Sequence, residues 1–192
     1  MSDSRNPFVC GWYTRPLRPT NEQATALAMT LGAARFAYNQ TLVRFDEMRE
    51  IHLSDRTAPR PTLVLLSREA REAAQDYPWM PQVCAAVLHE AVDDAVRNMQ
   101  LYFTGRTFRR PSLRSNDNDT ARFTARHFLI SENRIRLAKV GWIKMGGENP
   151  WPDGMPVHAT VDRWNGLWWS VDIHILLLSR PIREGAVTDR IV

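Results

Sequence analysis

The chain has 192 residues, of which 44% are hydrophobic, which suits a domain of ordinary size with a real core and argues against extensive disorder. Its net charge of +4 is unevenly spread: residues 104–145 hold ten basic and three acidic residues, so this segment is +7 and the other 150 residues sum to −3. This distribution predicts a phosphate-binding surface. No apolar run reaches the roughly 18 residues that cross a bilayer, so we expect no membrane contact and a soluble cytoplasmic protein.

The first predicted elements are a strand and two helices. Residues 8–18 are extended in character. Thr20 and Gln23 have the spacing of a capping box that starts a helix. Gly32 then breaks the helical pattern, and a second helix is expected over residues 33–52. Two helices joined at a glycine resemble a helix-turn-helix.

Two more helices are expected over residues 63–75 and 82–103. The second is the longest regular segment, and its apolar residues recur at the spacing of a buried stripe: Cys84, Leu88, Val92, Ala95, Met99 and Phe103. Polar residues fill its other faces, so we interpret the stripe as packing.

The remaining segments have β character, and they are 122–130, 134–137, 140–145, 157–164 and 167–175. Asn165-Gly166, between two alternating runs, is a strong hairpin signal. We predict an α+β fold, a small antiparallel wedge-like β-barrel with an inserted helical lobe. Its parts are the first strand of the barrel (1–18), the helical recognition lobe (19–104), a basic loop (105–119), the rest of the barrel (120–175) and a frayed tail (176–192).

No pattern in the sequence indicates catalysis or a cofactor. Cys10 and Cys84 are too few and too far apart for a zinc site, and we expect both in the core. Two-metal nucleases need clustered carboxylates, whereas the acids here are scattered, and Asp93-Asp94 indicates an ordinary charged helix face. We therefore expect no metal, no cofactor and no enzymatic activity from this chain alone.

The strongest binding signal lies in residues 105–114. This segment interleaves an aromatic ring with four arginines, and the five residues are Arg106, Phe108, Arg109, Arg110 and Arg114. Arginines make salt-dependent phosphate contacts, and Phe108 could stack on a base. The alternative is a solvated basic loop that Phe108 anchors. Arg15 and Arg18, near the end of the first strand, are further candidates for nucleic-acid contact.

Three ordered blocks carry a resemblance to a known family. The first contains Pro-Thr-Asn-Glu-Gln at 19–23 and Gly-Ala-Ala-Arg-Phe-Ala-Tyr-Asn at 32–39. The second runs over 79–103, and the third reads Arg-Ile-Arg-Leu-Ala-Lys-Val-Gly-Trp-Ile-Lys at 134–144. Together they resemble the N-terminal half of the TnpB/OrfB proteins of insertion sequences, which are RNA-guided DNA endonucleases.

The resemblance implies a wedge-type barrel and a recognition lobe that bind guide RNA, the guide–target duplex and a short DNA motif beside the target. It places Arg35 and Asn39 on the helix of its helix-turn-helix region, and Lys139 and Lys144 in the third block. These four join the candidate nucleic-acid contacts, with support of a loop as the alternative role for Asn39. The expected partners are guide RNA and double-stranded DNA, and the resemblance implies a bacterial cytoplasmic protein that is nucleoid-associated when bound to DNA.

The sequence departs from the family pattern in two places. Relatives often begin the long helix with polar residues that face DNA, whereas here 85–88 are apolar and only His89 is left. The family continues into a RuvC-like nuclease domain, and Asp189 lacks the glycine context that opens it. We expect a nucleic-acid-binding module without its own nuclease site. The alternatives are a subunit of a split endonuclease completed by a separate RuvC-like chain, and a transposon remnant without function.

Overall fold

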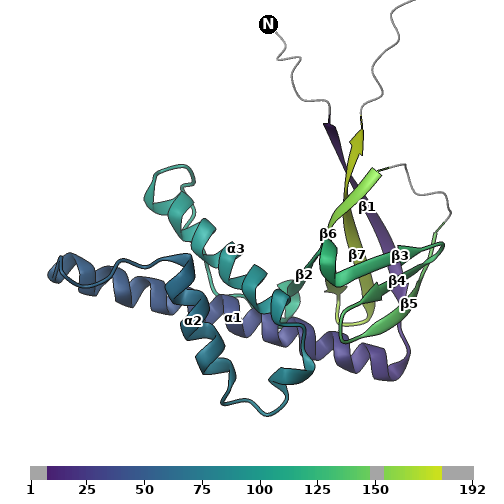
Figure 1. Ribbon diagram of the computed structural model, residues 1–192, viewed down its shortest axis with the longest axis horizontal. Coiled ribbons are helices and arrows are strands. Elements are labelled where there is room, and N and C mark those ends of the chain that lie inside the picture. Colours follow the sequence, from purple (N-terminus) through teal and green to yellow (C-terminus); the bar gives the residue numbers. More distant parts are fainter. Residues whose placement is uncertain (1–7, 148–153, 179–192) are drawn as a thin grey trace, which may run out of the picture.

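The computed structural model describes residues 8–147 and 154–178, in which a helical part extends away from one twisted sheet (Figure 1). The helices α1 (Asn21–Ser54), α2 (Leu63–Ala74) and α3 (Ala85–Phe103) follow the first strand, β1 (Phe8–Arg18). The other strands come after the helices: β2 (Thr120–Thr124), β3 (Phe128–Ser131), β4 (Arg134–Leu137), β5 (Gly141–Met145), β6 (Gly154–Trp164) and β7 (Trp168–Leu178). The predicted α+β class is confirmed.

The helix α1 begins with the predicted capping box. The Thr20 hydroxyl accepts a hydrogen bond from the Gln23 N–H at 3.3 Å, and the Gln23 side-chain oxygen accepts one from the Thr20 N–H at 3.0 Å. These bonds satisfy two donors that the first turn leaves unpaired.

The predicted break at Gly32 is wrong, because α1 continues through it as one helix of 34 residues. The buried residues on either side of Gly32 form one stripe that packs along α3, and they include Leu31, Ala34, Tyr38 and Phe45. Burying that stripe on one straight helix outweighs the cost of about 1 kcal/mol that a glycine adds to a helix interior. Tertiary packing thus overrides the local signal.

The predicted helices at 63–75 and 82–103 are confirmed in α2 and α3. The helix α3 ends in a Schellman motif, in which Gly105 has a φ of 70° and the Arg106 N–H donates to the Leu101 carbonyl at 2.9 Å. Only glycine adopts this backbone at little cost, so the basic loop leaves α3 in a fixed direction.

The sheet is antiparallel and open, with the strand order β2-β6-β7-β1-β5-β4-β3. The predicted closed barrel is wrong, because the two edge strands β2 and β3 do not pair with each other. A 3-10 turn, η3 (Ala125–His127), separates these strands where one strand over 122–130 was expected, and α1 and α3 pack against β2. The helices therefore pack against one edge strand of an open sheet.

The hairpin between β6 and β7 forms as predicted. Asn165 and Gly166 have φ values of 50° and 69°, and the Leu167 N–H donates to the Trp164 carbonyl at 3.1 Å, as in a type I′ turn. The strand β7 runs beyond the predicted end of the sheet, since Leu176 pairs with Cys10. The tail expected from residue 176 is therefore wrong at its start, and residues 179–192 lie outside the described residues.

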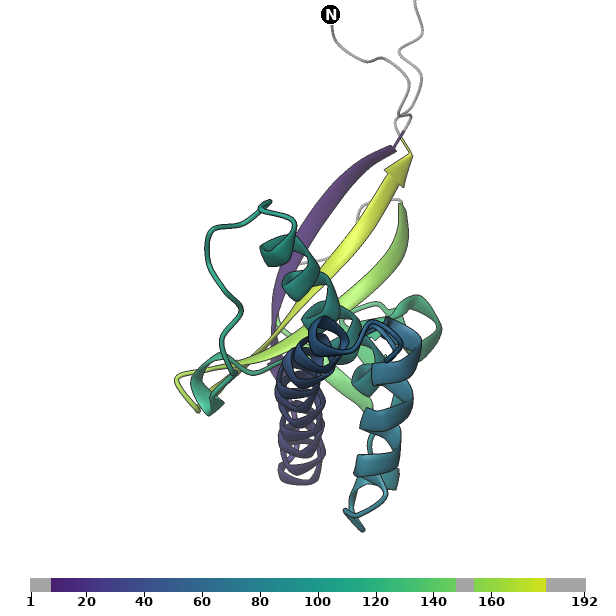
Figure 2. The same ribbon diagram turned by 90° about the vertical axis from the view of Figure 1, so that its left-hand side faces the viewer.

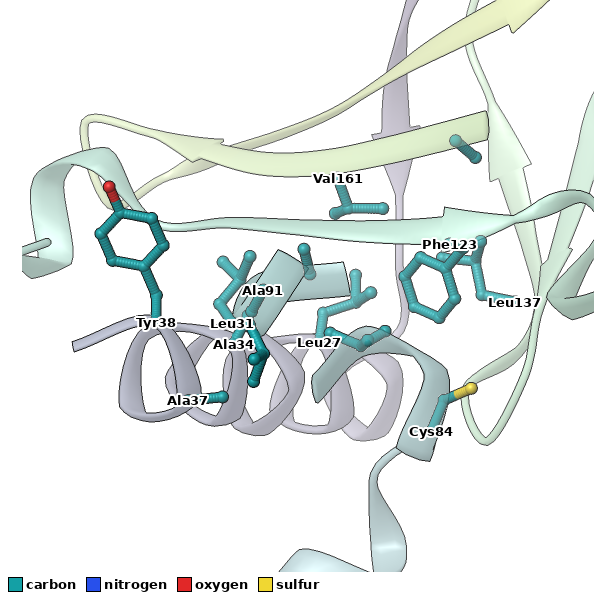
Figure 3. Packing of buried hydrophobic residues seen from close by; sticks show 14 of the residues in the cluster. Leu27, Leu31, Ala34, Ala37, Tyr38, Cys84, Ala91, Phe123, Leu137 and Val161 are labelled. Atoms are coloured by element: carbon teal, nitrogen blue, oxygen red, sulfur yellow. The ribbon is translucent and has the colours of Figure 1, made fainter. Parts of the chain in front are cut away.

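One core joins the sheet to the helices. Leu27, Leu31 and Ala34 of α1 point toward Phe123 and Val161 of the sheet, as Figure 3 shows. Alternate residues of the strands are buried, which leaves the opposite side of the sheet free to carry polar and charged groups. Cys84 is buried as expected, but Cys10 is exposed because it lies on that outer side.

The glycine in α1 gives a direct test of the continuous helix. A Cβ at Gly32 would meet no atom within 4 Å, so Gly32→Ala should raise the free energy of unfolding by about 1 kcal/mol. Gly166→Ala is the matched control, because its surroundings are equally open but its φ is +69°; it should lower stability by about 1 kcal/mol. Urea unfolding followed by circular dichroism measures both. A loss of stability in Gly32→Ala would contradict the single helix.

Candidate nucleic-acid interface

The basic loop, residues 105–119, is held against α1 at its far end. The Arg114 N–H donates to the Asn39 side-chain oxygen at 2.8 Å, and the Asn39 side-chain amide donates to the Arg114 carbonyl at 3.0 Å. The Arg114 guanidinium lies over the Tyr38 ring, 3.8 Å from its centre. Asn39 therefore supports the loop, which is the alternative role that the sequence left open for it.

A mostly buried carboxylate ties this end of the loop to the sheet. Asp94 of α3 accepts hydrogen bonds from Arg97 at 2.9 Å and from Arg122 of β2 at 3.0 Å, and its second oxygen lies 3.6 Å from the Arg114 guanidinium. Glu90, one turn earlier on α3, lies 3.8 Å from Arg122. The predicted charged helix face at Asp93-Asp94 is thus an ion network that joins helix, loop and strand.

A second ion pair closes the same junction. Arg35 of α1 donates to the buried Asp119 at 2.9 Å. Burial raises the pKa of Asp119, while the charges of Arg35 and Arg114 act in the opposite direction. Arg35 and Arg114 have acidic partners within the chain, so we interpret both as side chains that hold the loop in place. A phosphate would have to compete with Asp119 and Asp94 for them.

The middle of the loop is exposed. Arg106, Arg109 and Phe108 project into solvent, and neither arginine forms an ion pair with another described residue. Arg110 differs, because it is paired with Asp46 of α1. An open groove of about 390 Å³ lies under the loop, and its lining includes Tyr38, Asn98, Thr107, Arg109 and Ser112. The loop therefore presents cations, hydroxyls and an aromatic ring together.

A second group of cations lies on the outer side of the sheet. Arg18 of β1 is paired in register with Lys144 of β5, which is paired with Arg134 of β4. The three form a row across neighbouring strands, all exposed, and none has an acidic partner within the described part of the chain. In the next row, Arg136 is paired with the exposed Trp142. Like charges in neighbouring cross-strand positions repel, so this row is suited to an anionic ligand.

The two remaining predicted residues, Lys139 and Arg15, do not lie in the cation row. Lys139 is exposed in the β4–β5 turn with a φ of 69°, at the opposite end of these two strands from the Arg134–Lys144 pair. Arg15 lies on the same side of β1 as the buried Leu17, and its side chain packs beside Gly147, so it does not join Arg18. The basic loop and the strands β3, β4 and β5 are on opposite sides of the molecule in both views (Figures 1 and 2).

Arg134 and Arg136 were missed as individual site residues, although they counted toward the basic segment. The signal was present, because Arg-Ile-Arg-Leu alternates and places both arginines on the side of β4 opposite Ile135 and Leu137. The partner strand was the missing information. Only the register with β5 shows that Arg134 lies beside Lys144.

Other polar groups of the described chain offer little chemistry. His89, the one polar residue left at the start of α3, lies with its ring nitrogen 3.3 Å from the Ser67 hydroxyl of α2. Among the described residues, no group of three or more His, Cys, Asp or Glu side chains could hold a metal ion. None of the helices in the described ranges combines the length and the apolar character that crossing a membrane requires.

Comparison with known families adds to this geometry. Residues 13–51 match the family model HTH_OrfB_IS605, which describes a helix-turn-helix domain. The match supports an OrfB-type N-terminal region, and with it DNA binding in a transposon-associated protein. In this structure the matched residues are the second half of β1 and the greater part of the single helix α1. No curated protein sequence matches the chain.

The role of Asn39 can be tested by removing its side chain. Asn39→Ala deletes both hydrogen bonds to the Arg114 backbone and should lower the free energy of unfolding by about 1–3 kcal/mol. It should also speed amide hydrogen exchange at Arg114. Gln40→Ala, a half-buried neighbour on the same helix, is the control and should leave that exchange rate unchanged. Equal exchange rates in the two variants would show that Asn39 does not hold the loop.

Proposed function

We propose that this chain is the nucleic-acid-binding module of a TnpB/OrfB-type, transposon-associated protein, and that it binds guide RNA and target DNA. The observation that carries the proposal is the match of residues 13–51 to a helix-turn-helix model, in a fold whose exposed cations lie beside that region. The match is to a DNA-binding type of domain, and the cations supply the physical means of holding phosphates.

The basic loop is the first proposed contact surface. Arg106 and Arg109 have no acidic partner among the described residues, so a phosphate can bind them without breaking an ion pair. Arg110 and Arg114 are paired with Asp46 and Asp94, and they contribute less. Fixing the loop at both ends lowers the entropy cost of binding, because the ends are already ordered in the free protein.

The cation row of Arg18, Lys144 and Arg134 is the second proposed surface. Because the strands β4 and β5, which carry Arg134 and Lys144, lie across the molecule from the basic loop (Figure 1), one continuous stretch of duplex would have to wrap around the fold to reach both surfaces. Two separate nucleic-acid segments, such as a guide RNA and its DNA target, reach the two surfaces more simply. The separation of the two surfaces supports two nucleic-acid partners rather than one.

In this proposal the chain binds nucleic acid and does not cleave it. Phosphodiester hydrolysis by two metal ions needs carboxylates that converge on both ions. In the described residues, Asp94 and Asp119 are engaged by arginines, and the outer-side carboxylate of Asp172 accepts a hydrogen bond from the Thr14 hydroxyl. Magnesium-dependent cleavage of plasmid DNA by the purified chain would contradict this part of the proposal.

The contribution of the loop can be measured as a salt dependence. The double variant Arg106→Ala/Arg109→Ala should bind DNA more weakly, and the slope of log affinity against log salt should flatten by about 2, since each phosphate contact contributes about 0.9. Fluorescence anisotropy with a labelled duplex measures this slope between low and physiological salt.

The matched control is Arg68→Ala/Arg71→Ala on α2, which removes the same charge from exposed positions away from the loop. It should leave the slope nearly unchanged. If the two double variants weaken binding equally, the loop is no specific contact surface and only the net charge matters. Sequencing the RNA that co-purifies with the chain tests the guide RNA, and recovery of no defined RNA would contradict that partner.

A further inference from the structure

The outer side of β3, β4 and β5 carries a second row of exposed residues beside the cation row. Leu129, Arg136 and Trp142 are consecutive partners across the three strands, and they form what we call the Trp142 row. Leu129 and Trp142 are 56% and 43% exposed. On the inner side of the same strands, Ile135 and Ile143 are completely buried. Two large apolar side chains are thus left in water, one on either side of an arginine.

The cations of this corner of the sheet lie next to the Trp142 row. Arg134 and Lys144 are two positions along the same strands and on the same side, which puts them about 7 Å from the row. Residues 126–145 contain five basic residues and one acidic residue, Glu132, so this unit carries +4, as much as the whole chain. Arg134, Arg136 and Lys144 form no ion pair with another described residue. Like charges this close repel, and binding of an anion would relieve the repulsion.

The Trp142 indole stands on a fixed backbone. The Gln23 side chain donates a hydrogen bond to the Trp142 carbonyl at 2.8 Å, which ties this strand to the first turn of α1. The next residue of β5, Ile143, is anchored in the core. An indole has only two rotatable bonds, so little entropy is lost when a ligand orders it. The row therefore offers a flat apolar ring in a defined place.

An open hollow lies at the other end of the Trp142 row. Its volume is about 230 Å³, and its lining includes Arg126, Leu129 and Arg136. A ligand that extends from Trp142 past Arg136 into this hollow would meet cations and apolar groups in alternation. Such a ligand has to combine flat rings with negative charges.

We propose that an unpaired nucleotide strand lies across the outer side of β3, β4 and β5, with a base stacked on Trp142 and phosphates on Arg134, Arg136 and Lys144. This inference rests on the proposed function, which treats the cation row as a nucleic-acid surface, and adds that its ligand is single-stranded. Aromatic side chains on the open face of a sheet bind unpaired bases in other folds. In a continuous duplex the ring faces are covered by neighbouring bases, so the indole would contribute nothing.

The chemistry favours a nucleotide strand over an acidic protein segment. Carboxylates could pair with the arginines, but a peptide would also have to place a flat apolar side chain over Trp142. Each nucleotide carries a ring and a phosphate a few bonds apart, so every unit of the strand supplies both. Because every base has a ring face, the site should tolerate any base sequence.

The test compares a labelled single-stranded oligonucleotide with a duplex that carries the same number of phosphates, by fluorescence anisotropy. Trp142→Ala should lose about 10-fold in affinity for the single strand, since stacking on one aromatic residue is worth a factor of this order. It should bind the duplex as the wild type does. DNA and RNA single strands are measured separately. A 10-fold loss with either supports the site, and the larger loss identifies the strand that it holds.

Two further variants separate stacking from simple burial of apolar surface. Trp142→Tyr keeps a ring face and should retain most of the single-strand affinity, whereas Trp142→Leu keeps apolar area and should lose it. Trp12→Ala is the matched control, because its indole is 62% exposed but is stacked on His174, about 20 Å along β1 from Arg18. It should leave both affinities unchanged.

Photo-crosslinking locates the strand on the unaltered protein and does not depend on how a variant folds. A single strand that contains 5-bromouracil is irradiated with the wild-type chain, which is then cut with trypsin. We expect the crosslinked nucleotide on the peptide 140–144, which lies between two tryptic sites and contains Trp142.

The outcomes distinguish this inference from the proposed function. Unchanged single-strand affinity in Trp142→Ala would overturn the stacking site, while binding of duplex by the wild type would still support the module. Failure of the wild type to bind any of the ligands would overturn both. If Trp142→Leu binds as well as the wild type, if crosslinks map only outside 140–144, or if polyglutamate displaces the strand as well as an unlabelled oligonucleotide of equal charge, the surface is a general anion contact and the stacking site is wrong.

Discussion

The Asp94 carboxylate lies between three arginines that come from α3, from the end of the basic loop and from β2. The helix, the loop and the strand are held together by this one negative charge. Without this negative charge, Arg97, Arg114 and Arg122 would repel one another at the point where the helices meet the sheet, in surroundings where water screens charges poorly. Together with the Asn39 hydrogen bonds to Arg114, this carboxylate fixes the far end of the loop that carries Arg106 and Arg109.

Elements with strong local signals could be predicted from the sequence, and those decided by distant packing could not. The capping box at Thr20, the stripe of α3 and the Asn165-Gly166 turn depend on residues a few positions apart. Gly32 looked like a turn because its local cost is real, but a buried stripe shared with α3 offsets that cost. The prediction of a closed barrel was wrong for a similar reason, since no local pattern shows that helices pack against β2.

The candidate interface was predictable to the level of a charged segment. Arg106, Arg109, Arg110 and Arg114 look alike in sequence, yet two are unpaired among the described residues and two have carboxylate partners 64 or 20 positions away. Charge counting cannot make this distinction, because ion pairing is a property of the folded chain.

The continuity of α1 has a mechanical consequence. A helix of 34 residues is about 50 Å long, and its first turn is fixed to β5 by the hydrogen bond from the Gln23 side chain to the Trp142 carbonyl at 2.8 Å. Such a rod acts as a lever with its pivot at the sheet. A rotation of about 5° at that pivot would displace the Ser54 end by about 4 Å. A small tilt of β5 on binding an anion would therefore be amplified at the distant end of the helical part.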